Sequence, residues 1–444
     1  MKPEIPIQFA NMPIAYKIVH GCVSVKRLRQ AMQQVVAKEA VLRTSFHMEP
    51  TTKKWYQQIE ELTDEGFIFT ESELGQNSNS DSLLDLMILE RAPNLFTLDG
   101  SRRVHLHIVR RHLNDNDQQQ DDGATYDTLC IEDIIIITVR HESIDYTSMK
   151  FLMDELSDAY RNGHLENQPD AVSYLDYTLY ERRNDRSVGF NYWQEHQRNL
   201  NTADFLSHIP CDQPWIAHPP AVVPAHSIVS RVDKNITQTM LQCADACNTT
   251  LATICLASFC AFIYDMTNYW HDDIGITYTM ASRPTEPEAG GLIGPFMYLK
   301  LLRMHLENGP HTTFLKLVHW VRSAVMEGFK HVRATHDPFD TNIHDALSPS
   351  SLSPEMCPCV AVQFDLEENN HLILDEAGDA RLDILRNEDD GFPLDMWWRV
   401  ASNDYWITLF NYNPEAEELR CVSIFPATLF ERPTAVSFLL GEIV

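Results

Sequence analysis

The chain has 444 residues, of which 44% are hydrophobic and 22% charged, and its formal net charge at pH 7 is −28. A chain of this length can bury a full core in two lobes, and its acidity argues strongly against a nucleic-acid partner, because phosphate binding needs clustered lysine and arginine. No apolar stretch approaches the roughly 20 residues of a membrane helix and no signal-peptide hydrophobic region opens the chain, so we expect a cytoplasmic protein without a membrane partner.

The first predicted elements are a strand over residues 16–19 and a helix that Ser24 caps, whose apolar side chains recur at i, i+4, i+7 and i+8. Residues 42–46 continue into another strand. Apolar side chains alternate with histidines in residues 103–110, which predicts a strand with two distinct faces. The strongly polar residues 114–123 have no apolar side chain to bury, so we expect a solvated loop between two neighbouring strands.

The clearest strand signal is the isoleucine-rich run over residues 134–139, because β-branched runs of this length are typical of buried strands. This strand leads into a loop over residues 140–146. A one-sided apolar pattern then predicts a helix over residues 148–160. Residues 162–186 are largely polar and irregular, which suggests a boundary between lobes.

Strands and helices continue to alternate beyond this boundary. The predicted elements are a helix over 250–266 and strands over 274–279, 358–364 and 404–412. This alternation favours an α/β sandwich architecture over an all-α or all-β one. We therefore predict an N-terminal lobe over residues 1–170, which carries His141, and a C-terminal lobe over residues 171–444.

His141 and Asp145 stand four residues apart in the loop after the isoleucine-rich strand. Loops at strand ends are where a rigid scaffold presents reactive side chains. A histidine with the ordinary pKa of about 6.5 is mostly neutral at pH 7 and can accept a proton, while a nearby carboxylate can fix the loop geometry. Taken without other motifs, His141 fits a structural or surface histidine better than a catalytic one.

His105 and His107 share one strand face at i and i+2, a spacing that suits a metal ion. The sequence shows no third ligand beside them. A surface or packing role is therefore the favoured interpretation, and we predict no metal site.

Several short segments stand in a fixed order along the chain: LRTSF at 42–46, RHESIDY at 140–146, YLDY at 174–177, YW at 192–193, SRP at 282–284, IGPF at 293–296 and PF at 338–339. Their order and spacing resemble the motifs of nonribosomal peptide synthetase condensation domains, which have the chloramphenicol acetyltransferase-like fold. The loop at 140–146 matches the second histidine and the aspartate of the HHxxxDG pattern of this family.

The chain departs from the family pattern at several positions. Arg140 replaces the first histidine of the motif, Tyr146 replaces its glycine, and Tyr298 and Leu299 stand where the family has Asn-Thr. The most N-terminal segment of the family, of the SxAQxR type, has no counterpart. Two explanations of this difference stay open: the first strand is missing, or the sequence is a truncated gene product.

The resemblance implies an α/β fold of two chloramphenicol acetyltransferase-like lobes, each a mixed sheet with helices, which form a V with a tunnel between them. It implies an acyltransferase that joins an acyl thioester, held on the phosphopantetheine arm of an acyl or peptidyl carrier protein, to an amine or hydroxyl. No cofactor would be bound directly. His141 would be the catalytic base or positioning group, and Asp145 would form a structural ion pair with Arg283.

The changed motif positions leave other functions open. A glycine tolerates positive φ, whereas a tyrosine at position 146 would do so only at a cost, and its phenol could narrow the tunnel. At the position of the first motif histidine, the Arg140 side chain fits either a solvated or an ion-paired role. The alternatives are a non-catalytic condensation-like module that recruits carrier proteins and an acyltransferase that uses coenzyme A thioesters.

Overall fold

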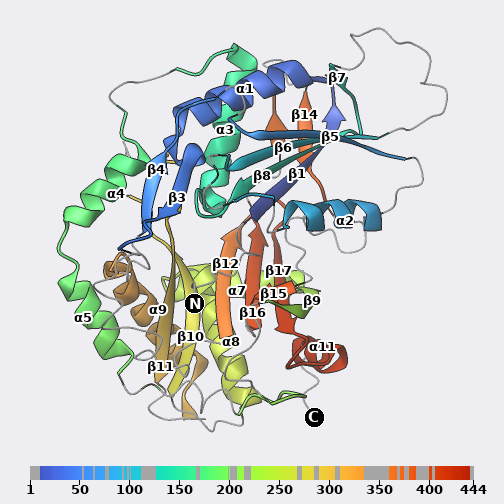
Figure 1. Cartoon of the computed structure of the whole chain (residues 1–444). Helices are drawn as coiled ribbons and strands as arrows, with labels where there is room; N and C mark the ends of the chain where they lie inside the picture. Colours follow the sequence, from blue (N-terminus) through green and yellow to red (C-terminus); the bar gives the residue numbers. More distant parts are fainter. Residues whose placement is uncertain are drawn as a thin grey trace.

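A computed structural model of the chain describes residues 11–52, 55–63, 66–75, 80–92, 95–97, 100, 102–111, 127–166, 171–198, 200, 208–214, 222–267, 273–284, 290–305, 311–334, 360–367, 371–374, 380–386, 400–402 and 406–440. Two large sheets organise these residues into two lobes (Figure 1). This arrangement agrees with the predicted α/β fold of two lobes. The predicted loop at 114–123 and the PF segment at 338–339 lie outside the described residues.

The sheet of the first lobe has six strands. In spatial order they are β13 (His371–Ile373), β14 (Arg381–Ile384), β1 (Asn11–His20), β8 (Ile134–Arg140), β6 (Val104–Arg111) and β5 (Ile68–Leu74). Only β5 and β6 pair in parallel. The strands β13 and β14 come from the C-terminal half of the chain, so the first sheet is not built from residues 1–170 alone. The lobe boundary at residue 170 stays a prediction.

Helices cover both faces of this sheet, which explains the unbroken apolar run in β8. On one face α1 (Val25–Lys38) and α3 (Tyr146–Asn162) pack together over alternate residues of the strand, including Ile135 and Ile137. On the other face Ile134 and Ile136 pack against α2 (Ser80–Glu90). Every residue of β8 is therefore buried. The predicted helix cap is confirmed, because the Ser24 side chain accepts a hydrogen bond from the backbone N–H of Arg27.

The strand β6 has the two distinct faces that its alternating sequence predicts. Val104, Leu106 and Ile108 lie in the apolar core with α1 and α3. His105 and His107 lie on the opposite face, and they are buried. Of the surface or packing role favoured for these histidines, the surface alternative is therefore wrong.

The sheet of the second lobe has seven strands. In spatial order they are β11 (Met297–His305), β10 (Asp273–Ala281), β12 (Val360–Leu366), β16 (Trp406–Asn413), β17 (Glu418–Pro426), β9 (Val222–Arg231) and β15 (Val400–Ser402). The central strands β10, β12 and β16 run parallel, and the remaining pairs are antiparallel. Their carboxyl ends point toward the first lobe, as the arrowhead of β12 shows in Figure 1.

The core of the second lobe is centred on α8 (Leu251–Met266), which confirms the helix predicted at 250–266. Thr250 caps this helix by accepting a hydrogen bond from the N–H of Thr253. The other helices of this lobe are α7 (Lys234–Ala246), α9 (Phe314–Lys330) and α11 (Arg432–Leu440). In the described ranges no helix is long and apolar enough to cross a membrane alone; α7 and α8 together meet the length and composition required, with a bend of 109° between them.

One helix lies within residues 162–186, where the sequence predicts an irregular boundary, so that prediction is partly wrong; a second helix begins directly after this region. They are α4 (Tyr174–Arg183) and α5 (Ser187–His196). The helix α4 buries Tyr177 and exposes most of its other side chains, which removes the apolar periodicity that would reveal it. Its start is nevertheless encoded locally, because Ser173 and Asp176 form a reciprocal capping box. Short strands β2 (Val23–Ser24), β3 (Thr44–Met48), β4 (Trp55–Ile59) and β7 (Thr128–Leu129) complete the first lobe.

Candidate active site

His141 lies directly after β8 and is half-buried. Its Nδ1 atom is 2.8 Å from the carbonyl oxygen of Ile144. A carbonyl oxygen only accepts hydrogen bonds, so Nδ1 must carry the hydrogen. In the neutral ring Nε2 then has the lone pair. The loop backbone thus selects the tautomer in which Nε2 can accept a proton.

Asp145 ends the same loop and caps α3. Its side chain is 4% exposed. One oxygen, Oδ1, accepts hydrogen bonds from the Ser148 N–H at 2.7 Å and from Arg283 Nη2 at 2.8 Å. The other oxygen, Oδ2, accepts from the Phe296 N–H at 3.0 Å. The ion pair with Arg283 that the resemblance implies is therefore present.

The contacts of Asp145 belong to a wider connection between the lobes, which we call the interlobe latch. It comprises Asp145 and Ser148 from the first lobe and Arg283 with the segment 292–296 from the second. Ser148 Oγ donates to the carbonyl of Gly294 at 2.7 Å and accepts from its N–H at 3.1 Å. Arg283 Nη1 donates to the carbonyl of Leu292 at 2.8 Å, and Nη2 also contacts Ser148 Oγ. The loop of His141 is thus fixed to the second lobe at its far end.

Gly294 is buried in the latch segment because the ring of Tyr174 lies directly on it. A Cβ atom at position 294 would overlap this ring. We expect Gly294→Ala to destabilise the fold by about 1–3 kcal/mol, the usual cost of overpacking, measured by chemical denaturation. Gly291→Ala, in the same loop, is the matched control, because its Cβ would meet only an ordinary contact. If adding Tyr174→Ala does not recover part of the loss, the ring overlap is not its cause.

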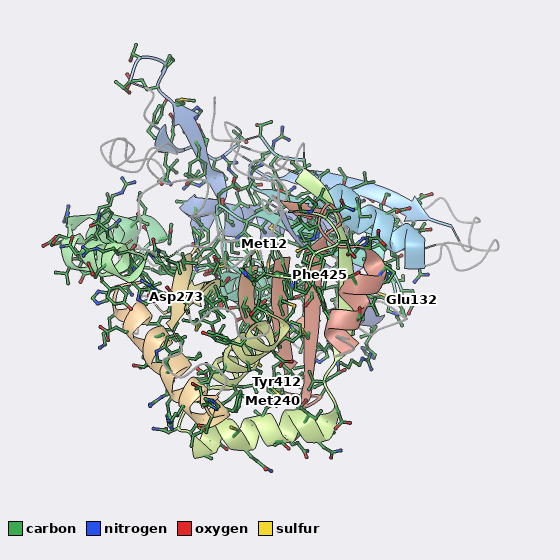
Figure 2. All side chains as sticks on the ribbon, turned by 90° about the horizontal axis from the view of Figure 1, so that it is seen from below. Met12, Glu132, Met240, Asp273, Tyr412 and Phe425 are labelled. Carbon is green, nitrogen blue, oxygen red and sulfur yellow. The ribbon has the colours of Figure 1, made fainter. Side chains whose placement is uncertain are left out.

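A cavity of about 550 Å³ lies between the lobes. The first lobe contributes Asp145, Tyr146, Thr147 and Lys150 to its lining. The second lobe contributes the start of α8 and the carboxyl ends of the three parallel strands; Figure 2 views the molecule from the side of the second lobe and labels Tyr412, near the end of β16. From the loop over residues 140–146, the described lining residues are Asp145 and Tyr146, at its end. His141, at the beginning of the loop, is not among them. A tunnel open from both mouths stays a prediction.

Tyr146 is the first residue of α3 and lines the cavity. In the described part of the chain, positive φ among non-glycine residues occurs at Glu132, Asn248 and Glu417. Tyr146 is not among them, so the backbone cost expected for replacing a glycine here does not arise. The phenol instead occupies part of the cavity wall.

Arg140 is 2% exposed and is fully engaged in the first lobe. Its Nε and Nη2 atoms donate to the two carboxylate oxygens of Glu142 at 2.7 and 2.9 Å, and Nη1 donates to the carbonyl of Phe96 at 3.1 Å. Of the two roles that the sequence leaves open, the ion-paired one is right and the solvated one is wrong.

Tyr298 is the second residue of β11 and, unlike its neighbour Met297, is not among the described residues that line the cavity. Burial and the nearby carboxylate of Glu181 raise the pKa of Tyr298 to about 12. The same carboxylate accepts a hydrogen bond from the Tyr177 hydroxyl at 2.8 Å and pairs with Arg333 at 3.4 Å. Tyr298 therefore belongs to a polar cluster at the side of the second lobe.

The sequence prediction misses Gln363 and Asp365, which line the cavity from β12. Their signal is the polar alternation inside an otherwise apolar strand. Gln363 Nε2 donates to Asp365 Oδ2 at 2.7 Å, and in the described ranges no cationic side chain forms an ion pair with Asp365. Burial raises the pKa of Asp365 from its ordinary 3.8 to about 6.

The raised pKa of Asp365 predicts a pH-dependent stability. The folded state holds the proton more tightly than the unfolded state, so the stability that protonation gives is complete below pH 3.8 and is lost as pH rises through about 6. The Asp365→Asn variant has no carboxyl group to ionise at this position. The free energy of unfolding of the variant minus that of the wild type should therefore be about 2 kcal/mol larger at pH 8 than at pH 4.5. The measurement is urea unfolding at both pH values, with the exposed Asp245→Asn as control. The same difference in free energy of unfolding at both pH values would contradict the prediction.

The sequence prediction also misses Glu90, at the end of α2. Its carboxylate lies between His105 and His107 and accepts a further hydrogen bond from Thr138 Oγ1 at 2.5 Å. Burial alone would raise the pKa of Glu90, but the hydrogen bonds from the two imidazoles and Thr138, together with the nearby charge of His105, lower it to about 2. The histidine pair therefore has the third partner that the sequence does not reveal.

Comparisons with known proteins find a matching family model and similar chains. Residues 131–338 match the Condensation domain family model, a range that includes the His141 loop and the latch segment. Surfactin synthase subunit 1 of Bacillus subtilis (strain 168) is 24% identical over 408 residues, which cover 87% of this chain and 10% of that protein. The chain thus spans about a tenth of the length of this relative.

Two solved structures have the same two-lobed fold. The condensation domain of the Monacolin K polyketide synthase MokA matches with a TM-score of 0.72 and 13% identity, covering 98% of this chain and 90% of that one. The X-domain from teicoplanin biosynthesis, solved in complex with OxyB, matches with a TM-score of 0.69 and 19% identity, covering 98% and 87%. The predicted fold is therefore confirmed.

Proposed function

We propose that this chain belongs to the condensation-domain family, whose model matches residues 131–338, and that it joins a carrier-bound acyl thioester to an amine or hydroxyl acceptor in nonribosomal peptide-type biosynthesis. The observation that carries the proposal is the hydrogen bond between His141 Nδ1 and the Ile144 carbonyl. It gives Nε2 the lone pair that proton acceptance needs, in a loop whose far end lines the interlobe cavity.

The chemistry needs few groups, because a thioester is already activated. The acceptor atom forms a bond to the thioester carbonyl carbon, the carbon–sulfur bond breaks, and the acceptor proton passes through His141 Nε2 to the departing thiolate. A weaker form of the same role is to orient the acceptor by a hydrogen bond. Either role rests on the placement of the two reactants and on a side chain positioned to accept the proton. The first-turn N–H of Tyr146 is suited to stabilise the oxyanion.

The acyl donor would arrive on the phosphopantetheine arm of an acyl or peptidyl carrier protein. This arm is part of the substrate, so the proposal assigns no directly bound cofactor. Asp145 lines the cavity, but its two carboxylate oxygens already accept from Ser148, Arg283 and Phe296. Asp145 and Arg283 therefore act on the reaction through the loop that they fix.

A single-turnover assay tests the proposal. Acyl-loaded carrier protein is mixed with the chain and a panel of amines and alcohols, and products are followed by mass spectrometry. We expect amide or ester formation faster than with carrier protein alone. A parallel reaction with the acyl-coenzyme A thioester identifies the donor class. Absence of product with every acceptor, together with measurable carrier binding, would refute catalysis.

A second candidate is a non-catalytic module that recruits carrier proteins or another protein of the same synthesis. The observation that favours it is the position of Arg140, where the family motif has its first histidine and where this chain has a buried structural ion pair. The X-domain with the same fold was solved in a complex with OxyB. Carrier binding without turnover in the assay above is the result that this candidate predicts.

A further inference from the structure

Outside the interlobe cavity, the first lobe contains a buried cluster of three side chains with metal-binding chemistry. It consists of Glu90 from α2 and His105 and His107 from β6, with side-chain exposures of 4, 4 and 10%. One ligand atom from each residue lies within 4.8 Å of the other two. His105 Nδ1 is 2.8 Å from Glu90 Oε2, and His107 Nδ1 is 2.8 Å from Glu90 Oε1.

The other nitrogen of each ring has its own partner. His105 Nε2 is 2.7 Å from Thr70 Oγ1, and His107 Nε2 is 2.8 Å from Ser72 Oγ, both on β5. Without a metal each Nδ1–H donates to the Glu90 carboxylate. Because a hydroxyl oxygen can also accept from Nε2–H, the rings can change to the tautomer with hydrogen on Nε2, which frees both Nδ1 lone pairs for a metal ion that binds between them and the carboxylate. Metal-bound histidines in proteins have this kind of outer partner for the nitrogen that does not bind the metal.

We propose that Glu90, His105 and His107 bind a divalent first-row transition metal ion, with zinc as the best fit. Two imidazoles and one carboxylate are a known zinc donor set, in which water takes the fourth tetrahedral position. Ligand atoms around a tetrahedral zinc stand about 3.4 Å apart, from metal–ligand lengths near 2.1 Å. The nitrogen–oxygen separations of 2.8 Å would therefore have to widen by about half an ångström for the ion to enter.

The site would have a structural role and does not depend on the proposed condensation activity. It joins the end of α2 to the sheet face that carries His105 and His107. An ion that binds the folded chain and not the unfolded one raises the unfolding temperature. We therefore expect zinc to raise the unfolding temperature of the full chain by a few degrees and a chelator to reverse this rise.

The decisive measurement is the metal stoichiometry of the full-length chain. We expect one zinc ion per chain after dialysis against trace zinc, measured by mass spectrometry of the metal. Cobalt(II) substitution should give ligand-field bands without a thiolate charge-transfer band, which separates this site from the free cysteines. Prior alkylation of those cysteines should leave the stoichiometry unchanged.

The variants His105→Asn and His107→Asn test the assignment of ligands. An asparagine amide can still donate to the Glu90 carboxylate, as Nδ1–H does, but it does not replace an imidazole as a zinc ligand. We expect the double variant to lose the bound zinc and the thermal shift. The exposed His164→Asn, after α3, is the matched control and should keep both.

Two results would overturn the proposal. One is a wild-type chain with no zinc and no thermal shift, which leaves a purely hydrogen-bonded cluster. The other is a folded double variant that binds as much zinc as the wild type. If the double variant does not fold, the zinc stoichiometry and the cobalt spectrum of the wild-type chain still test the proposal, because neither measurement needs a substitution.

Discussion

Replacing His141 by alanine should slow the single-turnover joining of acyl donor and acceptor by roughly 10²–10⁴-fold, the usual contribution of a positioned general base. The substitution removes Nε2, the proton acceptor that the loop backbone selects. It should leave the fold and carrier binding unchanged, because His141 is half-buried and its one recorded hydrogen bond in the described structure is to the Ile144 carbonyl. Rapid quenching followed by mass spectrometry of the product measures the rate.

His141→Asn separates the two contributions of this side chain. The asparagine amide can donate to the Ile144 carbonyl as Nδ1–H does, but it has no basic nitrogen in place of Nε2. If proton acceptance matters, the asparagine variant should be as slow as the alanine variant. If it retains most of the rate, His141 mainly holds the loop. The exposed His164→Ala is the matched control, and unchanged product formation in His141→Ala would refute the catalytic assignment.

The sequence predicts best those elements whose signals are local. The cap of α1 at Ser24 needs only a hydroxyl before an amphipathic run, and the helix predicted at 250–266 needs only its apolar residues. The unbroken apolar run of β8 predicts a strand that is buried on both faces. In the structure α1 and α3 cover one face and α2 covers the other. These predictions need no knowledge of distant residues.

The remaining features depend on residues that are far apart in the chain. Glu90 meets His105 and His107 only because α2 packs on the face of β6, and no sequence pattern encodes that packing. The return of β13 and β14 to the first sheet is likewise a pairing across most of the chain. The pairing of Asp145 with Arg283 spans 138 residues, and it came from the family resemblance rather than from the residue pattern.

The site shows the same division between local and distant information. The strand end and the spacing of His141 and Asp145 are visible in the sequence. The tautomer of His141 requires the position of the Ile144 carbonyl, and the role of Arg140 requires the positions of Glu142 and Phe96. A motif therefore locates the loop, while hydrogen-bond geometry decides what its side chains can do.

Breaking the interlobe latch should be the most damaging change to stability. Arg283→Met leaves the Asp145 carboxylate, which is 4% exposed, without its cationic partner. Removing one partner of a buried ion pair costs roughly 3–5 kcal/mol, and the 15% exposure of Arg283 favours the lower end of that range. Asp145→Ala also removes the cap of α3 and the acceptor for the Phe296 N–H, so its cost should be at least as large. Calorimetry or urea unfolding of both variants measures it.

A second arginine–aspartate pair supplies the matched control. Arg303 pairs with Asp273 at 2.6 Å within the second lobe, with side-chain exposures of 27 and 29%. Figure 2 labels Asp273. Solvent screens this pair, so Arg303→Met should cost only about 1 kcal/mol. If Arg283→Met costs no more than this control, the latch does not behave as a buried pair.

The double variant Asp145→Asn with Arg283→Met completes the test. Asparagine removes the charge and keeps an acceptor for the Ser148 N–H, so the cap of α3 survives. The two substitutions should therefore cost less together than the sum of their single effects, with a coupling of about 1–3 kcal/mol. Because the latch fixes the far end of the His141 loop, the same variants should also lower the single-turnover rate without any contact to substrate. A variant that lost stability but kept the full rate would show that the loop holds its catalytic geometry without the second lobe.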